Sequence, residues 1–213
     1  MPPDPVPALA PPAAAPLDAA LRARLDAVCD DGWALWEAFE AAPRDGFHPF
    51  VPADADAVLR ALLPFRAPGR RWLEWGSGAG TLTVLAALLG FDACGIELDA
   101  DLVETARGLA ARHAPPDGAP ARFAAGSFLP AGYQYRAPDG DRRTGTLGAG
   151  PSGYLALGRA LEDFDVVFGY PWDGEAPLMR DLMRRYGRPD AVLLLHDAVD
   201  GIRAYPGGRD PAP

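Results

Sequence analysis

Three glycines at alternate positions, directly after a short apolar run, constrain the fold of this chain more than any other feature. The run is Trp72 to Trp75, the glycines are Gly76, Gly78 and Gly80, and a helical pattern without a breaker follows from position 81. Glycine lets a backbone turn sharply and lets a ligand approach the main chain, and a helix start offers unpaired N–H groups. The order strand, turn, helix therefore predicts a site for a nucleotide-like ligand.

The glycine spacing separates two classes of ligand. A dinucleotide fingerprint, G-x-G-x-x-G, would place its third glycine at position 81, where Thr81 stands. The chain instead reads E-x-G-x-G-x-G over residues 74–80. This pattern resembles motif I of the class I S-adenosylmethionine-dependent methyltransferases. The acidic residue and the three glycines of that motif correspond to Glu74, Gly76, Gly78 and Gly80.

The resemblance covers about residues 46–200 and implies S-adenosyl-L-methionine as the cofactor. Glu97 lies near the carboxyl end of a second predicted strand, 93–98, where an acid bonds ribose hydroxyls. Because Asp99 caps the next helix, 100–113, we expect Glu97 to be free for the ligand. In the family the exit of the third strand, 121–125, borders the adenine. The predicted cofactor-binding residues are Glu74, Gly76, Ser77, Gly78, Gly80, Glu97, Leu98, Ser127 and Phe128.

Strand and helix patterns alternate along the chain, which predicts an α/β fold with helices on both faces of a parallel sheet. The expected fold class is a Rossmann-like sheet of order 3-2-1-4-5. Too few residues follow position 196 for the helix and hairpin that usually close this fold, so the C-terminal edge should be shortened to one strand over 201–205. We expect one domain, 17–205, between a disordered Pro- and Ala-rich tail, 1–16, and a frayed tail, 206–213. Its parts are cover helices 17–63, a cofactor half 70–128, an insertion 130–162 and an acceptor half 164–205.

Outside the glycine turn, one predicted helix covers the sheet, and two segments are candidate lids over the site. Residues 17–41 show apolar residues at threes and fours, typical of one amphipathic helix or of two interrupted near Gly32. A helix capped by Asp54 follows, and Phe47, His48 and Phe50 before it would supply an apolar lid. The insertion, 130–162, is either a substrate lid or a segment without a chemical role. Its lid candidates are Tyr133, Tyr135 and Tyr154.

The exit of the fourth predicted strand, 165–168, indicates where an acceptor binds. Amino-directed methyltransferases of adenine and glutamine carry Asp or Asn, Pro, Pro and an aromatic residue there, and only Pro171 and Trp172 match, so that specificity does not carry over. The exit instead resembles that of the small lysine methyltransferases. Tyr170 and Trp172 would form an aromatic wall, whose ring faces favour a cation by about 0.5–2 kcal/mol. The predicted substrate residues are Tyr170, Pro171 and Trp172.

His196 ends the fifth predicted strand, 191–196, at the same edge of the sheet. Histidine exchanges protons near neutral pH, so Tyr170 and His196 are the candidate catalytic residues. The alternative for His196 is a structural pair with Asp197. Three acids near the transfer site, Asp173, Glu175 and Asp197, would attract a cationic acceptor or are solvated loop charges.

Composition limits the partners. The chain of 213 residues carries a net charge of -9 and no lysine, and its arginine clusters are short and scattered, so a nucleic-acid acceptor is not expected. Cys29 and Cys94 show no metal-ligand spacing, and we expect no metal site. No apolar run is long enough for a membrane span and no signal peptide is evident, which favours a cytoplasmic protein without membrane contact. Oligomeric state is left open.

The sequence predicts a methyltransferase that transfers a methyl group from S-adenosyl-L-methionine to a small-molecule or protein acceptor, such as an amine. Methyl transfer needs donor and nucleophile held in line more than covalent help from the protein. For that reason the sequence defines the cofactor better than the acceptor. Two alternatives are a non-catalytic cofactor-binding module and an NAD(P)-dependent reductase, which the glycine spacing disfavours.

Overall fold

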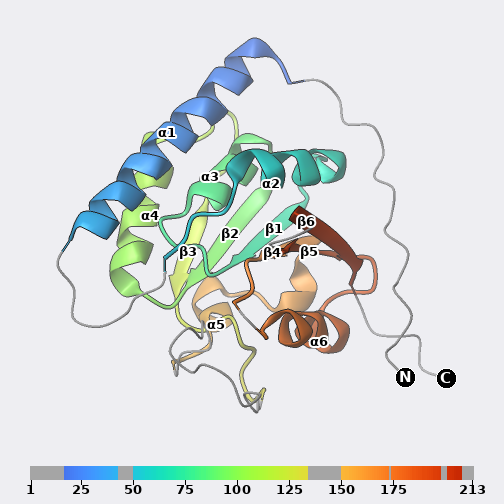
Figure 1. Ribbon diagram of the computed structural model, residues 1–213. Helices are drawn as coiled ribbons and strands as arrows, with labels where there is room; N and C mark the ends of the chain where they lie inside the picture. Colours follow the sequence, from blue (N-terminus) through green and yellow to red (C-terminus); the bar gives the residue numbers. More distant parts are fainter. Residues whose placement is uncertain (1–16, 43–49, 134–149, 173, 198–200, 208–213) are drawn as a thin grey trace.

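A central six-stranded sheet organises the chain (Figure 1). The computed structural model describes residues 17–42, 50–133, 150–172, 174–197 and 201–207. The sheet has the order β3-β2-β1-β4-β5-β6, with β1 to β5 parallel and β6 antiparallel to β5. This confirms the predicted order, and the single strand expected at the C-terminal edge is β6. The strands are β1 (Arg71–Trp75), β2 (Asp92–Glu97), β3 (Arg122–Ala125), β4 (Val166–Gly169), β5 (Val192–Asp197) and β6 (Gly201–Pro206).

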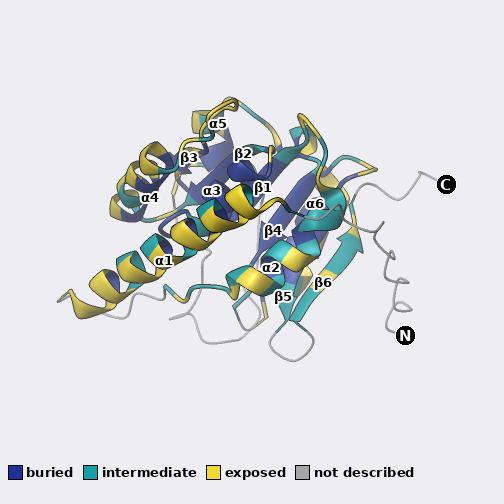
Figure 2. Ribbon diagram, turned by 90° about the horizontal axis from the view of Figure 1, so that it is seen from above, coloured by how far each residue is buried: buried dark blue, intermediate teal, exposed yellow. Residues whose placement is uncertain are grey.

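Helices cover both faces of the sheet, as predicted. Side chains alternate along a strand, so Trp72 of β1 packs in one core cluster and Leu73 and Trp75 pack in the other. Figure 2 shows the buried strands between helices whose outer sides are exposed. One face carries α1 (Ala19–Ala41), α2 (Ala55–Leu62), η1 (Leu63–Phe65), α3 (Thr81–Leu88) and α4 (Ala100–Arg112). The other carries α5 (Gly153–Leu157), η2 (Leu161–Asp163) and α6 (Ala176–Tyr186).

The N-terminal pattern forms one continuous helix, α1, without a break at Gly32. Asp18 caps it by accepting a hydrogen bond from the Leu21 backbone N–H. Gly32 is buried against the start of α3, where a Cβ atom would lie 2.3 Å from Thr81 Oγ1. Glycine therefore serves close helix packing here and does not end the helix, and α1 lies directly over the first turn of α3.

The second half of the predicted insertion belongs to the core. Ser127, after β3, pairs with Ser152 in a parallel bridge. Tyr154 of α5 is only 6% exposed, and its hydroxyl accepts a hydrogen bond of 2.8 Å from Trp75 Nε1. Tyr154 is thus a core residue, contrary to its assignment to a lid. Tyr133 donates a hydrogen bond to Asp181 of α6, and Tyr135 lies outside the described residues.

The described residues also bear on membrane spans, metal sites and disulfides. None of their helices has the length and apolar composition of a membrane span. Among them, no group of three or more His, Cys, Asp or Glu side chains could hold a metal ion. Both cysteines, Cys29 and Cys94, are free thiols.

Candidate functional site

The glycine turn between β1 and α3 has the backbone conformation that the sequence predicts. Gly76, Gly78 and Gly80 have φ angles of 68°, 50° and 86°, in the left-handed region that side chains other than glycine rarely adopt. The N–H groups of Gly76 and Ser77 donate to the Ile96 carbonyl oxygen at 2.9 and 3.1 Å. The turn is therefore held against the end of β2.

The three glycines meet different surroundings. A Cβ atom on Gly80 would lie 2.7 Å from Ala106 Cβ and from the Phe123 ring, so this glycine allows α3 to pack closely on α4 and β3. A Cβ atom on Gly78 would lie 2.4 Å from the ring of Phe50. One on Gly76 would meet nothing within 4 Å. Only Gly76 and Gly78 line a pocket, so Gly80 supports the turn from behind.

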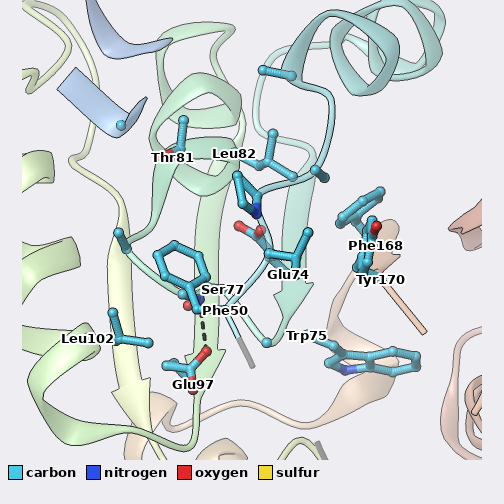
Figure 3. A pocket seen from close by; sticks show the side chains of 18 of the residues that line it. Phe50, Glu74, Trp75, Ser77, Thr81, Leu82, Glu97, Leu102, Phe168 and Tyr170 are labelled. Atoms are coloured by element: carbon cyan, nitrogen blue, oxygen red, sulfur yellow. Dashed lines mark hydrogen bonds between the residues drawn. The ribbon is translucent and has the colours of Figure 1, made fainter. Parts of the chain in front are cut away.

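A pocket of about 980 Å³ opens above the turn at the carboxyl edge of the sheet (Figure 3). Pockets for small molecules and cofactors commonly have about 300–1,000 Å³. The pocket joins the glycine turn, the end of β2, the exit of β4, one side of α1 and the start of α2. Its aromatic and acidic lining residues are Asp26, Asp30, Trp33, Phe50, Asp54, Asp56, Glu74, Trp75, Glu97, Asp99, Phe128, Phe168, Tyr170 and Trp172.

Glu97 lines the pocket at the end of β2, but it is not free as expected. Its Oε2 accepts a hydrogen bond of 2.8 Å from the Gly78 N–H, and its Oε1 accepts one of 2.9 Å from the Asp99 N–H (Figure 3). Each carboxylate oxygen has a second lone pair, so Glu97 can still accept from ribose hydroxyls. The glycine turn and the end of β2 are thereby joined through one side chain. Asp99 caps α4 by accepting from the Asp101 and Leu102 N–H groups.

Glu74 lies on the pocket floor and is only 5% exposed. The Thr83 hydroxyl, on the first turn of α3, donates a short hydrogen bond to Glu74 Oε2. Burial raises the pKa of Glu74 to about 8, although the hydrogen bonds from Thr83 oppose the shift and the nearby charge of Glu97 adds to it. A carboxylic acid that keeps its proton at neutral pH therefore faces the site.

Phe50 covers the turn, as predicted for the lid. Its ring packs edge-on against Phe39 of α1 at a centroid distance of 5.0 Å, and its carbonyl oxygen accepts a hydrogen bond of 3.0 Å from Trp36 Nε1. Phe47 and His48, the other two lid candidates, lie outside the described residues. An aromatic ring held by α1 thus lies directly over Gly78.

The acceptor side differs from the prediction in how its residues are arranged. Tyr170 and Trp172 line the pocket, whereas Pro171 and His196 are not among its lining residues. The His196 ring stacks on Tyr170 at 4.3 Å between centroids. Burial lowers the pKa of His196, with smaller opposing effects from the charges of Asp197 and Asp54. His196 is therefore harder to protonate than an exposed histidine, and it touches the pocket only through Tyr170.

Other predicted residues serve the framework of the site. Ser127 is buried, and its Oγ accepts a hydrogen bond from the Leu129 N–H, so it does not line the pocket. Glu175 is 3% exposed and accepts a hydrogen bond from the Trp172 N–H, which fixes the exit of β4. Asp197 does not line the pocket, and its Oδ2 lies 3.9 Å from Nε of Arg203 on β6. Asp173 lies outside the described residues.

Sequence reasoning missed the contribution of α1 and the start of α2. Asp26, Asp30 and Trp33 line the pocket from α1, and Asp56 lines it from α2. The periodicity showed that α1 covers the sheet but gave no direction for its polar face. The structure places Trp33 at the surface of α1, 53% exposed, where a large aromatic side chain often marks a binding site, but its exposure could not be read from the sequence.

Comparisons with known proteins agree with this architecture. No protein-family model matches the sequence, and a search of curated proteins finds no significant match. Among solved structures, an RNA methyltransferase from Salinibacter ruber in complex with S-adenosyl-L-homocysteine aligns with a TM-score of 0.52 at 18% identity, over 76% of this chain and 97% of that chain. The putative methyltransferase yhhF from Escherichia coli aligns with a TM-score of 0.49 at 16% identity, over 79% of this chain and 92% of that chain. A methyltransferase from Thiobacillus denitrificans aligns with a TM-score of 0.45 at 23% identity, over 76% of this chain and 54% of that chain. The chain has the Rossmann-like fold of the class I S-adenosylmethionine-dependent methyltransferases.

Proposed function

We propose that this protein is a methyltransferase that uses S-adenosyl-L-methionine to methylate a small molecule or a protein side chain. The observation that carries the proposal is the glycine turn of the E-x-G-x-G-x-G motif. Its Gly78 N–H bonds directly to the Glu97 carboxylate, and both residues line a pocket at the carboxyl edge of the strands. The carboxylate oxygens of Glu97 keep spare lone pairs that suit ribose hydroxyls. The residues present therefore fit this cofactor.

Each part of the pocket has a role in this proposal. Glu97 would accept hydrogen bonds from the ribose, and Gly76, which has open space beside it, would let the cofactor approach the backbone. Leu98 and Phe128 would border the adenine. When bound, the cofactor supplies an electrophilic methyl group on a sulfonium. The chain itself contributes orientation and exclusion of water, with Phe50 above the turn.

The charge of the pocket favours a cationic acceptor such as an amine. Its described lining residues include no Lys, Arg or His. Aspartates on α1 and α2 form an acidic rim, and the rings of Tyr170 and Trp172 border the same space. Carboxylates and ring faces both attract cations, whereas a phosphate polymer would be repelled. RNA is therefore not the acceptor that we propose, although the Salinibacter ruber protein is an RNA methyltransferase.

An amine must lose a proton before it attacks the methyl group. Among the described residues that line the pocket, Tyr170 is the only tyrosine, so we assign the proton-accepting role to its side chain. His196 is a positioning residue in this proposal, because it stacks on Tyr170 without lining the pocket. His196→Phe, which keeps a flat ring there, should retain most of kcat, whereas His196→Ala should reduce kcat further. Equal losses, with a changed pH profile of kcat, would instead make His196 the proton acceptor.

The test is calorimetric titration with S-adenosylmethionine, S-adenosylhomocysteine and NAD, followed by transfer of labelled methyl groups to fractions of a lysate. We expect the first two ligands to bind and NAD not to bind. Gly78→Ala should weaken binding, because its Cβ atom would clash with Phe50. Gly69→Ala is the control, since Gly69 has a similar φ of 74° but nothing within 4 Å. Binding of NAD alone would favour a reductase, and cofactor binding without transfer to any fraction would favour a non-catalytic module.

A further inference from the structure

Glu74 is a buried acid at the floor of the proposed cofactor pocket, and the described residues give it no cationic partner. The alternation of side chains along β1 directs it to the side of the sheet covered by α3. There its Oε2 bonds the Thr83 hydroxyl, and the described residues lining the pocket bring no basic side chain to it. An ionised carboxylate without a counter-charge is costly to bury, so an acid in this position holds a proton while the pocket is empty.

The surroundings of Glu74 suit both of its protonation states. A threonine hydroxyl can donate to a carboxylate or accept from a carboxylic acid, so Thr83 keeps its hydrogen bond either way. The charged group that faces Glu74 most directly is Glu97 from β2, whose negative charge raises the pKa of Glu74 further. Asp99, which caps α4, is half-buried at the same end of β2 as Glu97. The remaining acids of the pocket, Asp26 and Asp30 on α1 and Asp54 and Asp56 at α2, lie on its exposed rim. Nothing in this set offsets a charge on Glu74 until a cation enters.

We propose that Glu74 releases its proton when the sulfonium cofactor binds, so that its carboxylate becomes a counter-charge that distinguishes the charged donor from the neutral product. The proposal rests on the proposed function. The balance is simple: the O–H bond of the Glu74 carboxyl group breaks, the proton passes to solvent, and no bond of the cofactor changes. S-adenosylhomocysteine carries a neutral thioether in place of the sulfonium, so it induces less ionisation. Product would then leave a pocket that regains its proton.

The proposal predicts a pH-dependent preference for the donor. The apparent dissociation constant of a ligand that needs a minor state is divided by the population of that state. Because the pKa of Glu74 is raised to about 8, the affinity for S-adenosylmethionine should increase by up to about tenfold per pH unit from pH 6 toward pH 8 and then level off. Affinity for S-adenosylhomocysteine should change much less over the same range.

The experiment is calorimetric titration of the full chain with each ligand at pH 6.5, in buffers of different ionisation enthalpy. The slope of observed enthalpy against buffer enthalpy gives the number of protons released. We expect wild-type protein to release more protons with S-adenosylmethionine than with S-adenosylhomocysteine. The amino group of the ligand also titrates near neutral pH, so the same titrations are made on Glu74→Gln, in which only the ligand's own contribution is left.

Two controls keep the interpretation specific. Glu40→Gln makes the same acid-to-amide change at an exposed position of α1 that does not line the pocket, and it should leave the proton release unchanged. If Glu74→Gln does not fold, wild-type protein alone decides the question at pH 9, where Glu74 is already ionised and the excess release with S-adenosylmethionine should disappear.

The failures are distinguishable. If neither ligand binds, the proposed function is wrong and this inference falls with it. If both bind and wild-type protein releases equal numbers of protons with the two ligands, or if Glu74→Gln retains the difference, Glu74 is not the proton-linked group. The proposed function would stand in that case.

Discussion

At the scale of single residues, Glu74 makes the stability of the empty protein depend on pH. Its pKa is raised from 4.5 to about 8 in the folded chain. A group with a raised pKa contributes stability that is fully present below the unfolded value and is lost as the pH rises through the folded value. The loss should therefore fall between about pH 4.5 and pH 8.

We expect Glu74→Gln to remove this dependence. Relative to wild type, the variant should gain free energy of unfolding between pH 5 and pH 8.5, because wild-type protein then buries a charge that the variant lacks. Urea denaturation at both pH values measures the change, and Asp56→Asn serves as an exposed acid-to-amide control. A constant difference between wild type and Glu74→Gln would show that Glu74 is ionised throughout.

The glycines of the turn give a second test at this scale. Gly80→Ala combines a left-handed φ with a clash against Ala106 and Phe123, and overpacking of this kind costs about 1–3 kcal/mol. Gly76→Ala meets no atom, so it should cost only the backbone strain of about 1–2 kcal/mol. In thermal unfolding, Gly80→Ala should have a lower melting temperature than Gly76→Ala. The reverse order would mean that α3 can move away from α4 without loss.

At the scale of elements, α5, which follows β3 in the chain, contributes Tyr154 to the core. We expect excision of residues 136–148, joined by a short glycine linker, to leave a folded protein that binds the cofactor, because α5 and its contacts stay. Tyr154→Phe, in contrast, should cost about 1–3 kcal/mol, because it leaves Trp75 Nε1 buried without a partner. Denaturation and calorimetry on both variants test this. An excised chain that folds but no longer binds would place residues 136–148 in the cofactor site.

Elements with strong local patterns were predictable from the sequence. β1, α3, β2 and α4 follow from apolar runs, glycines and the Asp99 cap, all of which are local signals. The short α5 was not predicted, because five residues without a side-chain cap have little helical preference of their own and depend on Tyr154 packing in the core. Glu97 was expected to be free, because its bond to Gly78 joins two segments and no local pattern reports it.

At the scale of the whole molecule, the negative charge should prevent binding to nucleic acid. The net charge is -9, and the described residues lining the pocket bring acids without a basic side chain. We expect no measurable affinity for RNA at physiological salt, since phosphate contacts from Lys and Arg supply most of non-specific binding. Filter binding between about 50 and 200 mM salt measures it. A complex that weakens steeply with salt would reveal a basic surface away from the pocket.

The lining of the pocket comes from segments that lie far apart in the sequence, which has a consequence during synthesis of the chain. Residues of α1 and α2, which roof the pocket, leave the ribosome before the glycine turn, and Phe168 and Tyr170 follow much later. Domains form as units once their long-range partners are available. A nascent chain therefore carries the α1 and α2 side of the pocket before Phe168 and Tyr170 exist, and we expect the complete pocket to form only after β4 has joined the sheet.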